Sequence, residues 1–126
     1  MQRLPQQLAD EKLGDFVRQV REARLAIDPS FSVRQLAIRC GVSPAFLSRF
    51  ERGDVPPPSE RVLLKLASEL GQDPDVLLAM AGKISADLRA AILARPKLFA
   101  ELIRAVRVVP DHALLRVVRE VRDGDW

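Results

Sequence analysis

The sequence has little of what most catalytic and metal sites are built from. Its 126 residues include one cysteine, one histidine and no tyrosine. A single cysteine excludes an internal disulfide, and with a single histidine it excludes the usual zinc clusters. There is no glycine-rich phosphate loop, and the acidic residues are scattered without a paired arrangement. His112 has no nucleophile near it, so we expect a surface histidine, no enzymatic activity, no metal and no cofactor.

Long apolar runs and an excess of one charge are also lacking. No apolar run reaches transmembrane length, and the N-terminus lacks the basic-then-apolar order of a signal peptide, so we expect a cytoplasmic protein. Residues 1–82 carry 11 Lys and Arg against 11 Asp and Glu, and residues 83–126 carry nine against six. A net charge of only +3 does not predict nucleic-acid binding by bulk charge. A hydrophobic content of 48% does predict a folded core.

The stretch from Ser32 to Gly53 reads SVRQLAIRCGVSPAFLSRFERG and predicts two short helices joined by a tight turn. Gly41 stands where the chain must turn, and glycine reaches positive φ without steric cost. Ser43 and Pro44 then form a helix-start signal, as an N-cap followed by the first helical residue. The residues that we expect on the inner faces of the two helices and their turn are Leu36, Ala37, Cys40, Val42, Leu47 and Phe50.

This pattern resembles the helix-turn-helix of the Cro/cI-like (XRE) transcriptional regulators. Counted from Val33, the small residue Ala37 takes the fifth place and Gly41 the ninth, as in that family. The run from Ser43 to Gly53 also follows the family's serine, aromatic, leucine, serine, glutamate and glycine order. The resemblance implies an all-α fold, with a five-helix lambda-repressor-like domain that binds double-stranded DNA.

Apolar periodicity and capping signals extend this domain over residues 12–82 and leave residues 1–11 as a polar N-terminal lead-in. The expected helices of the domain cover residues 12–26, 33–40, 43–52, 60–70 and 74–81. In the first of them we expect Leu25 on the inner face. A short insertion relative to the family follows, and we expect Ile27 and Phe31 from it to enter the core.

Residues 83–126 predict three further helices, with more aliphatic side chains than the first domain can bury. We therefore expect a helical C-terminal dimerisation region, since exposed apolar area of this size usually marks an interface. The alternative is a helical cap that folds back over the fourth and fifth helices. The residues expected to form the dimer contact are Leu98, Phe99, Leu102, Ile103, Val106, Leu114, Leu115 and Val118.

The resemblance also implies which residues meet DNA, because in this family the second motif helix enters the major groove. Base-facing positions would be Pro44, Ala45, Ser48 and Arg49, and Arg49 is the strongest candidate because its fork can bond guanine O6 and N7 together. Serines at helix N-termini and flanking arginines suit phosphates. The full set is Ser32, Arg34, Ser43, Pro44, Ala45, Phe46, Ser48, Arg49 and Arg52, with Phe46 either on the sugar-phosphate or in the core.

Three other charged residues have expected roles, and only the pairing of Arg21 with Glu51 is implied by the resemblance. In the family an arginine at the place of Arg21 pairs with the glutamate that ends the recognition helix, here Glu51; the alternative is a solvated Arg21. Arg39 is expected to be a solvated charge. Between residues 18 and 52, seven arginines oppose three acidic residues, so the motif is locally basic.

The resulting hypothesis is a sequence-specific repressor or autoregulator that binds an inverted repeat as a homodimer. By analogy with relatives that carry such tails, the C-terminal helices would alternatively bind a toxin or be cut by a regulatory peptidase. A second class is a protein-interaction module that keeps the fold without binding DNA. Arg34, Arg49 and Arg52 argue against it, because they have no predicted packing role.

Overall fold

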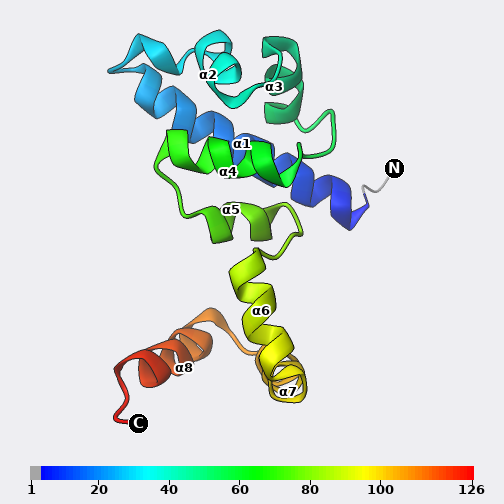
Figure 1. Ribbon diagram of the computed structural model, residues 1–126, viewed down its shortest axis with the longest axis vertical. Helices are drawn as coiled ribbons and strands as arrows, with labels where there is room; N and C mark the ends of the chain where they lie inside the picture. Colours follow the sequence, from blue (N-terminus) through cyan, green and yellow to red (C-terminus); the bar gives the residue numbers. More distant parts are fainter. Residues whose placement is uncertain (1–3) are drawn as a thin grey trace. The chain divides into compact units, whose positions relative to one another are not determined.

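The computed structural model describes residues 4–126 and divides into two compact units, one ending at Ala86 and one from Asp87 to Trp126 (Figure 1). Across the described residues it contains eight α-helices, a short 3-10 turn and no strand, which confirms the all-α prediction. The elements are α1 (Pro5–Leu25), the turn η1 (Pro29–Phe31), α2 (Val33–Cys40), α3 (Pro44–Glu51), α4 (Glu60–Leu70), α5 (Pro74–Met80), α6 (Ala86–Ala94), α7 (Pro96–Val106) and α8 (Asp111–Asp123).

Local signals in the sequence set most helix ends of the first unit. The hydroxyl of Ser32 accepts a hydrogen bond from the Gln35 N–H at 3.2 Å, and that of Ser43 accepts one from the Phe46 N–H at 3.0 Å. These caps satisfy donors that a helix start leaves without a partner. Gly41 ends α2 with a φ of 75°, the left-handed conformation that the turn into α3 requires.

The first helix begins seven residues earlier than the predicted start at residue 12. Pro5 is the first residue of α1, and the Gln7 side chain accepts a hydrogen bond from the Leu4 N–H at 2.9 Å. Proline at the first helical position is a known start signal, because its missing N–H would have no helical partner there. The predicted lead-in is therefore wrong for residues 5–11, and its residues 1–3 lie outside the described residues.

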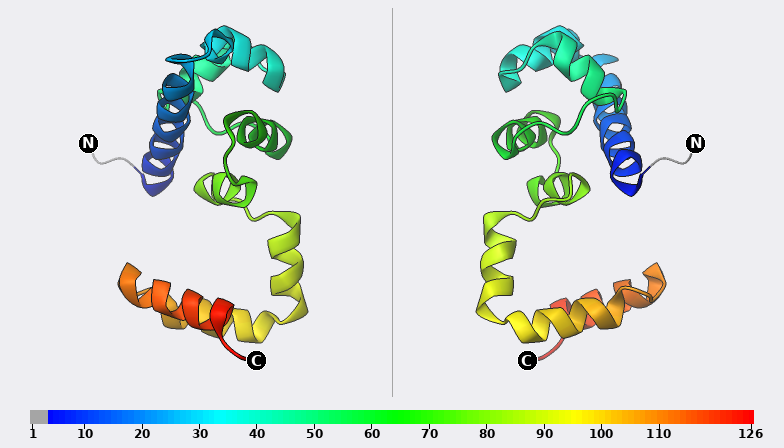
Figure 2. Two further views of the ribbon diagram at one scale, coloured as in Figure 1. Left: turned by 90° about the vertical axis from the view of Figure 1, so that its left-hand side faces the viewer. Right: turned by 90° about the vertical axis from the view of Figure 1, so that its right-hand side faces the viewer.

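The five helices α1 to α5 enclose the core of the first unit (Figures 1 and 2). Helix α1 packs against α3 and α5, and α2 packs against α3 and α4. The buried apolar residues of this core are Leu13, Val17, Phe31, Leu36, Ala37, Cys40, Leu47, Phe50, Leu63, Leu66, Ala67, Leu70, Leu77, Leu78 and Ala81. All motif residues predicted to face inward are in this list except Val42, which packs partly buried against it.

The insertion after α1 contributes one residue to the core instead of the two expected. Phe31 is buried, whereas Ile27 is 88% exposed and Leu25 is also exposed, so those two predictions are wrong. The guanidinium groups of Arg24 and Arg39 lie over the Phe31 ring, 5.4 and 5.1 Å from its centroid. Contacts of Phe31 with these two cations therefore help to hold the inserted turn.

Gly14 allows the close approach of α1 and α3. A Cβ at this position would overlap the carbonyl oxygen of Phe50 and lie 2.9 Å from that of Glu51. Glycine in a helix interior costs about 1 kcal/mol relative to alanine, so its presence there needs a packing reason. The backbone contact with α3 is that reason.

The second unit, residues 87–126, has no buried residue. Phe99 and Leu102 on α7 and Leu114 and Val118 on α8 belong to a groove of about 610 Å³ between the two helices. The complete lining is Phe99, Leu102, Ile103, Val106, Leu114, Val117, Val118, Val121 and Arg122.

Six of the eight residues predicted for dimerisation line this groove. Leu98 and Leu115 do not, although both are exposed. The structure adds Val117 and Val121, which the prediction did not include. Helix α8 begins at Asp111, with Pro110 as its N-cap.

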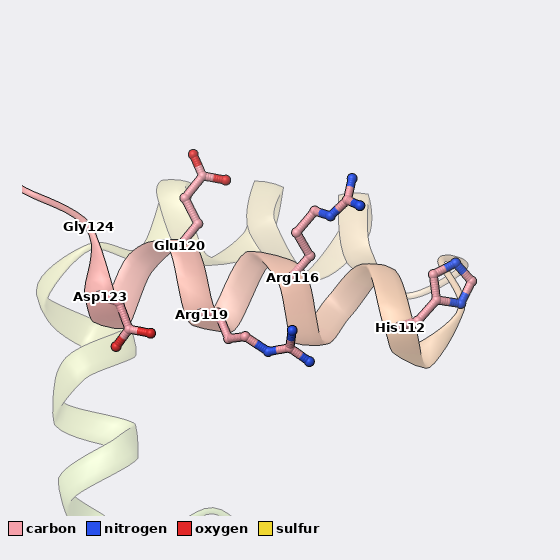
Figure 3. Close-up of a pocket in the computed structure, with 6 residues that line it drawn as sticks. All are labelled: His112, Arg116, Arg119, Glu120, Asp123 and Gly124. Atoms are coloured by element: carbon pink, nitrogen blue, oxygen red, sulfur yellow. The ribbon is translucent and has the colours of Figure 1, made fainter.

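The other side of α8 is polar. Its side chains include His112, Arg116, Arg119, Glu120 and Asp123, which Figure 3 shows along the helix. Apolar and charged residues thus separate onto opposite faces at helical spacing, as expected for a helix that covers or joins another surface with one face only.

The thiol of Cys40 is buried, and this burial raises its pKa, with the nearby Glu69 carboxylate adding to the effect. The folded state favours the neutral thiol, so this contribution to stability is present below the unfolded pKa and is lost as the pH rises through the folded pKa. Because the thiolate is the reactive form, we expect iodoacetamide at pH 8.5 to alkylate the native chain at least about tenfold more slowly than the urea-unfolded chain. Mass spectrometry would follow the alkylation. Equal alkylation rates for the native and the unfolded chain would contradict the buried position of Cys40.

Candidate nucleic-acid interface

The two faces of α3 differ sharply in exposure. Leu47 and Phe50 are buried in the core on one face. On the other, Pro44, Ala45 and Arg49 are exposed. An α-helix whose inner face is fixed and whose outer face is free is suited to lie against a large surface such as a DNA groove.

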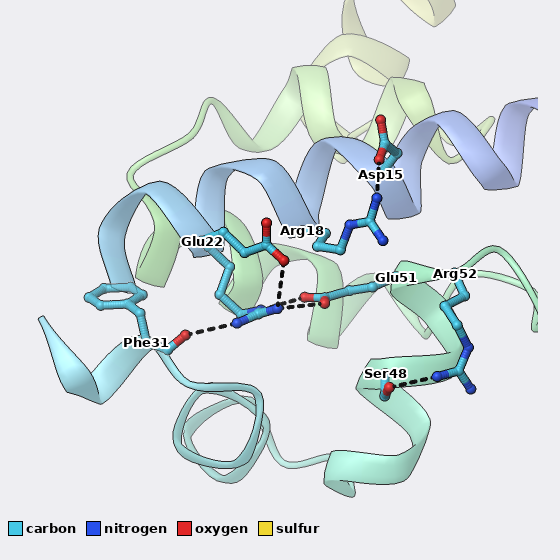
Figure 4. Close-up of polar contacts among 8 residues, drawn as sticks. Asp15, Arg18, Glu22, Phe31, Ser48, Glu51 and Arg52 are labelled. Carbon is cyan, nitrogen blue, oxygen red and sulfur yellow. Dashed lines mark hydrogen bonds and ion pairs between the residues drawn. The ribbon is translucent and has the colours of Figure 1, made fainter. Parts of the chain in front are cut away.

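A buried ion pair fixes α3 to α1. The Arg21 Nε donates to Glu51 Oε2 at 2.7 Å and its Nη2 donates to Oε1 at 2.9 Å, with both side chains almost fully buried (Figure 4). The Arg21 Nη1 also donates to the Phe31 carbonyl oxygen at 3.2 Å. The Glu51 carboxylate raises the pKa of Arg21. These contacts confirm the pair that the family resemblance implied and exclude a solvated Arg21.

Two exposed arginines of the helix-turn-helix make no internal interaction. Arg34 on α2 and Arg49 on α3 have no hydrogen bond or ion pair with any described residue. Arg52 is different, since its Nε donates to Asp54 Oδ2 and its Nη1 to Ser48 Oγ, each at 3.0 Å. The guanidinium groups of Arg34 and Arg49 are therefore available to an outside partner, whereas that of Arg52 is engaged.

Three other residues predicted to contact DNA have side chains that are engaged within the domain. Ser32 and Ser43 use their hydroxyl oxygens as helix caps, so an anion at these N-termini would meet backbone N–H groups first. Phe46 is partly buried and packs against the core, which favours the core alternative over a free aromatic surface. No group of three or more His, Cys, Asp and Glu residues is placed to hold a metal ion in residues 4–126.

The sequence was also compared with known proteins. A family model described as a helix-turn-helix domain matches residues 12–80, from the third turn of α1 to the end of α5. The chain belongs to this helix-turn-helix family. The family is one of XRE-like DNA-binding domains, so the chain has the domain of a DNA-binding regulator. No curated protein and no solved structure gave a match.

Within the helix-turn-helix domain, sequence analysis missed the role of Arg39. Its Nε donates to Glu69 Oε2 at 2.9 Å and its Nη1 donates to the Ser30 carbonyl oxygen at 2.6 Å. The prediction of a solvated charge is therefore wrong, because Arg39 joins α2 to α4 and to the inserted turn.

None of the helices in the part of the chain that the structure describes has the length and apolarity needed to cross a membrane.

Proposed function

We propose that the chain is a sequence-specific, dimeric transcriptional repressor or autoregulator that reads an inverted repeat with α3. One observation carries the proposal most directly. The outer face of α3 carries the unpaired Arg49, while the Arg21–Glu51 pair and the buried Phe50 hold the inner face in place. A rigid helix with a free, chemically specific face is what base recognition in the major groove needs.

The exposed residues of α2 and α3 suit different parts of the DNA. The fork of Arg49 can donate two hydrogen bonds to guanine O6 and N7. Pro44 and Ala45 have no polar side-chain atoms, so they suit the methyl group of thymine or a sugar. Arg34, on the helix that would cross the backbone, suits a phosphate.

The second unit would join two copies of the chain so that they bind DNA together. A single small domain contacts few bases, whereas two copies joined through their α7–α8 grooves would present two α3 helices to half-sites about 34 Å apart. A dimer of this kind would repress by occupying the promoter. The apolar groove residues on α7 and α8 are exposed in the single chain, apart from the half-buried Phe99 and Val106, as a self-pairing surface requires.

Replacing Arg49 by alanine is expected to remove sequence preference while leaving the fold unchanged, because the side chain is exposed and has no internal partner. Loss of a bidentate contact to guanine should cost about 1–3 kcal/mol of discrimination in each half-site. A 30-bp consensus duplex would first be selected from a random pool with the full chain. Fluorescence anisotropy would then compare the wild type and Arg49→Ala on this duplex and on a scrambled one.

The matched control is Arg61→Ala, an exposed arginine on α4 outside the recognition helix. It is expected to leave the ratio of consensus to scrambled affinity unchanged. If Arg49→Ala keeps that ratio, or if the full chain selects no consensus, groove reading by α3 is wrong and the interaction-module alternative is favoured.

A further inference from the structure

Ser48 and Arg52 are joined by a hydrogen bond on the outer side of α3 (Figure 4). The Arg52 Nη1 donates to Ser48 Oγ at 3.0 Å, and its Nε donates to Asp54 Oδ2 at the same distance. Asp54 is itself anchored, because its backbone N–H donates to the Arg49 carbonyl oxygen at 2.9 Å. One end of the guanidinium is therefore held at the end of α3, and the other end is directed at the Ser48 hydroxyl.

The direction of this hydrogen bond determines what Ser48 can offer to a partner. A guanidinium group only donates, so Ser48 Oγ must be the acceptor. A serine inside a helix commonly donates back to the carbonyl oxygen four residues earlier, but the Ser48 hydroxyl donates to no described residue. Its hydrogen is thus left for an outside acceptor, and the adjacent positive charge strengthens it as a donor.

We propose that Arg52 is a positioning residue that makes Ser48 a dedicated hydrogen-bond donor toward one base in each half-site. A free serine hydroxyl can donate or accept, so alone it discriminates poorly between bases. Held as a donor, Ser48 donates to guanine O6 or N7, adenine N7 or thymine O4 and disfavours the amino group of cytosine, which is itself a donor. This inference rests on the proposed function and gives Arg52 a role other than the phosphate contact that the family resemblance implied.

The charge around Arg52 supports this role. The carboxylate of its partner Asp54 offsets the positive charge of Arg52, so Arg52 attracts a phosphate less than an unpaired arginine would. Arg34, by contrast, has no such partner among the described residues. The two arginines should therefore respond differently to salt and to base changes, and this difference gives a direct test.

The test measures anisotropy on the selected duplex and on a set in which each base pair is replaced in turn, over a salt series. Ser48→Ala is expected to lose discrimination at one position of each half-site by about 3- to 10-fold, the value of one hydrogen bond. Arg52→Lys is expected to lose discrimination at that same position with the salt slope unchanged, since a single ammonium cannot bridge Asp54 and Ser48 as the guanidinium fork does. The double variant should be no worse than Ser48→Ala alone.

Arg34→Ala is the control for a phosphate contact, expected to weaken all duplexes alike and to lower the salt slope by about one. The inference is overturned if Arg52→Lys behaves like Arg34→Ala or leaves every base preference intact. If the wild-type chain itself shows no base preference, both the inference and the proposed function fail. If it shows one that Arg49→Ala removes and Arg52→Lys does not alter, only the inference fails.

Discussion

Replacing Glu51 by alanine is expected to reduce the free energy of unfolding by about 3–5 kcal/mol, because the Arg21 guanidinium then stays buried without its carboxylate. Small domains are stable by only about 5–15 kcal/mol in total, so much of the population would be unfolded at moderate temperature. Urea unfolding of the full chain, followed by far-UV circular dichroism, measures the loss. DNA binding should fall with the folded fraction, since this pair holds α3 against α1.

Glu69→Ala is the matched control for this prediction. Glu69 also pairs with an arginine, Arg39, but both side chains keep about a quarter of their surface exposed. A partly solvated pair contributes roughly 0–1 kcal/mol, so the control should unfold near the wild-type urea concentration. Equal losses for Glu51→Ala and Glu69→Ala would show that burial of the Arg21–Glu51 pair is not what stabilises the domain.

The second large effect is expected from Leu102→Glu in the α7–α8 groove. A carboxylate in this apolar surface would have to be desolvated when two copies meet, so the variant should be monomeric. Since pairing makes binding of the second half-site intramolecular, affinity for the inverted repeat should fall about a hundredfold or more. Affinity for a duplex with one half-site should change little. Light scattering after size-exclusion chromatography measures the oligomeric state, and anisotropy measures both affinities.

Arg104→Glu places the same carboxylate on the same helix, at an exposed residue outside the groove lining. It changes the net charge more than Leu102→Glu does but leaves the apolar groove intact, so the dimer should persist. A wild-type chain that is monomeric at micromolar concentration would contradict self-pairing. In that case the groove would be left to a different protein, such as a toxin or a regulatory peptidase.

The helix-turn-helix was readable from the sequence because its signals are local. Gly41, Ser43 and Pro44 set the turn and the start of α3 through backbone conformation and capping, which depend on near neighbours only. The Arg21–Glu51 pair, 30 residues apart, was reachable only through the family resemblance. Nothing in the spacing of the two residues by itself distinguishes a buried pair from two solvated charges.

Two of the errors concern tertiary packing, which local patterns in the sequence do not show. Arg39 looked solvated because Glu69, its partner, lies 30 residues further along the chain. Ile27 looked like a core residue because it is apolar, but of the inserted residues it is Phe31 that enters the core, while Ile27 stays exposed. Two other features had local signals that were available in the sequence, namely Pro5 at the start of α1 and the four-residue spacing of Ser48 and Arg52.

The placement of α3 in the major groove is tested most directly by photocrosslinking. The selected duplex would carry 5-iodouracil at each thymine in turn, since the 5-position faces the major groove. Trypsin cuts after Arg39 and Arg49, so one peptide, residues 40–49, contains the exposed face of α3 from Pro44 to Arg49. We expect the half-site thymines to crosslink to this peptide. Crosslinks confined to peptides from α4, α7 or α8 would contradict recognition by α3.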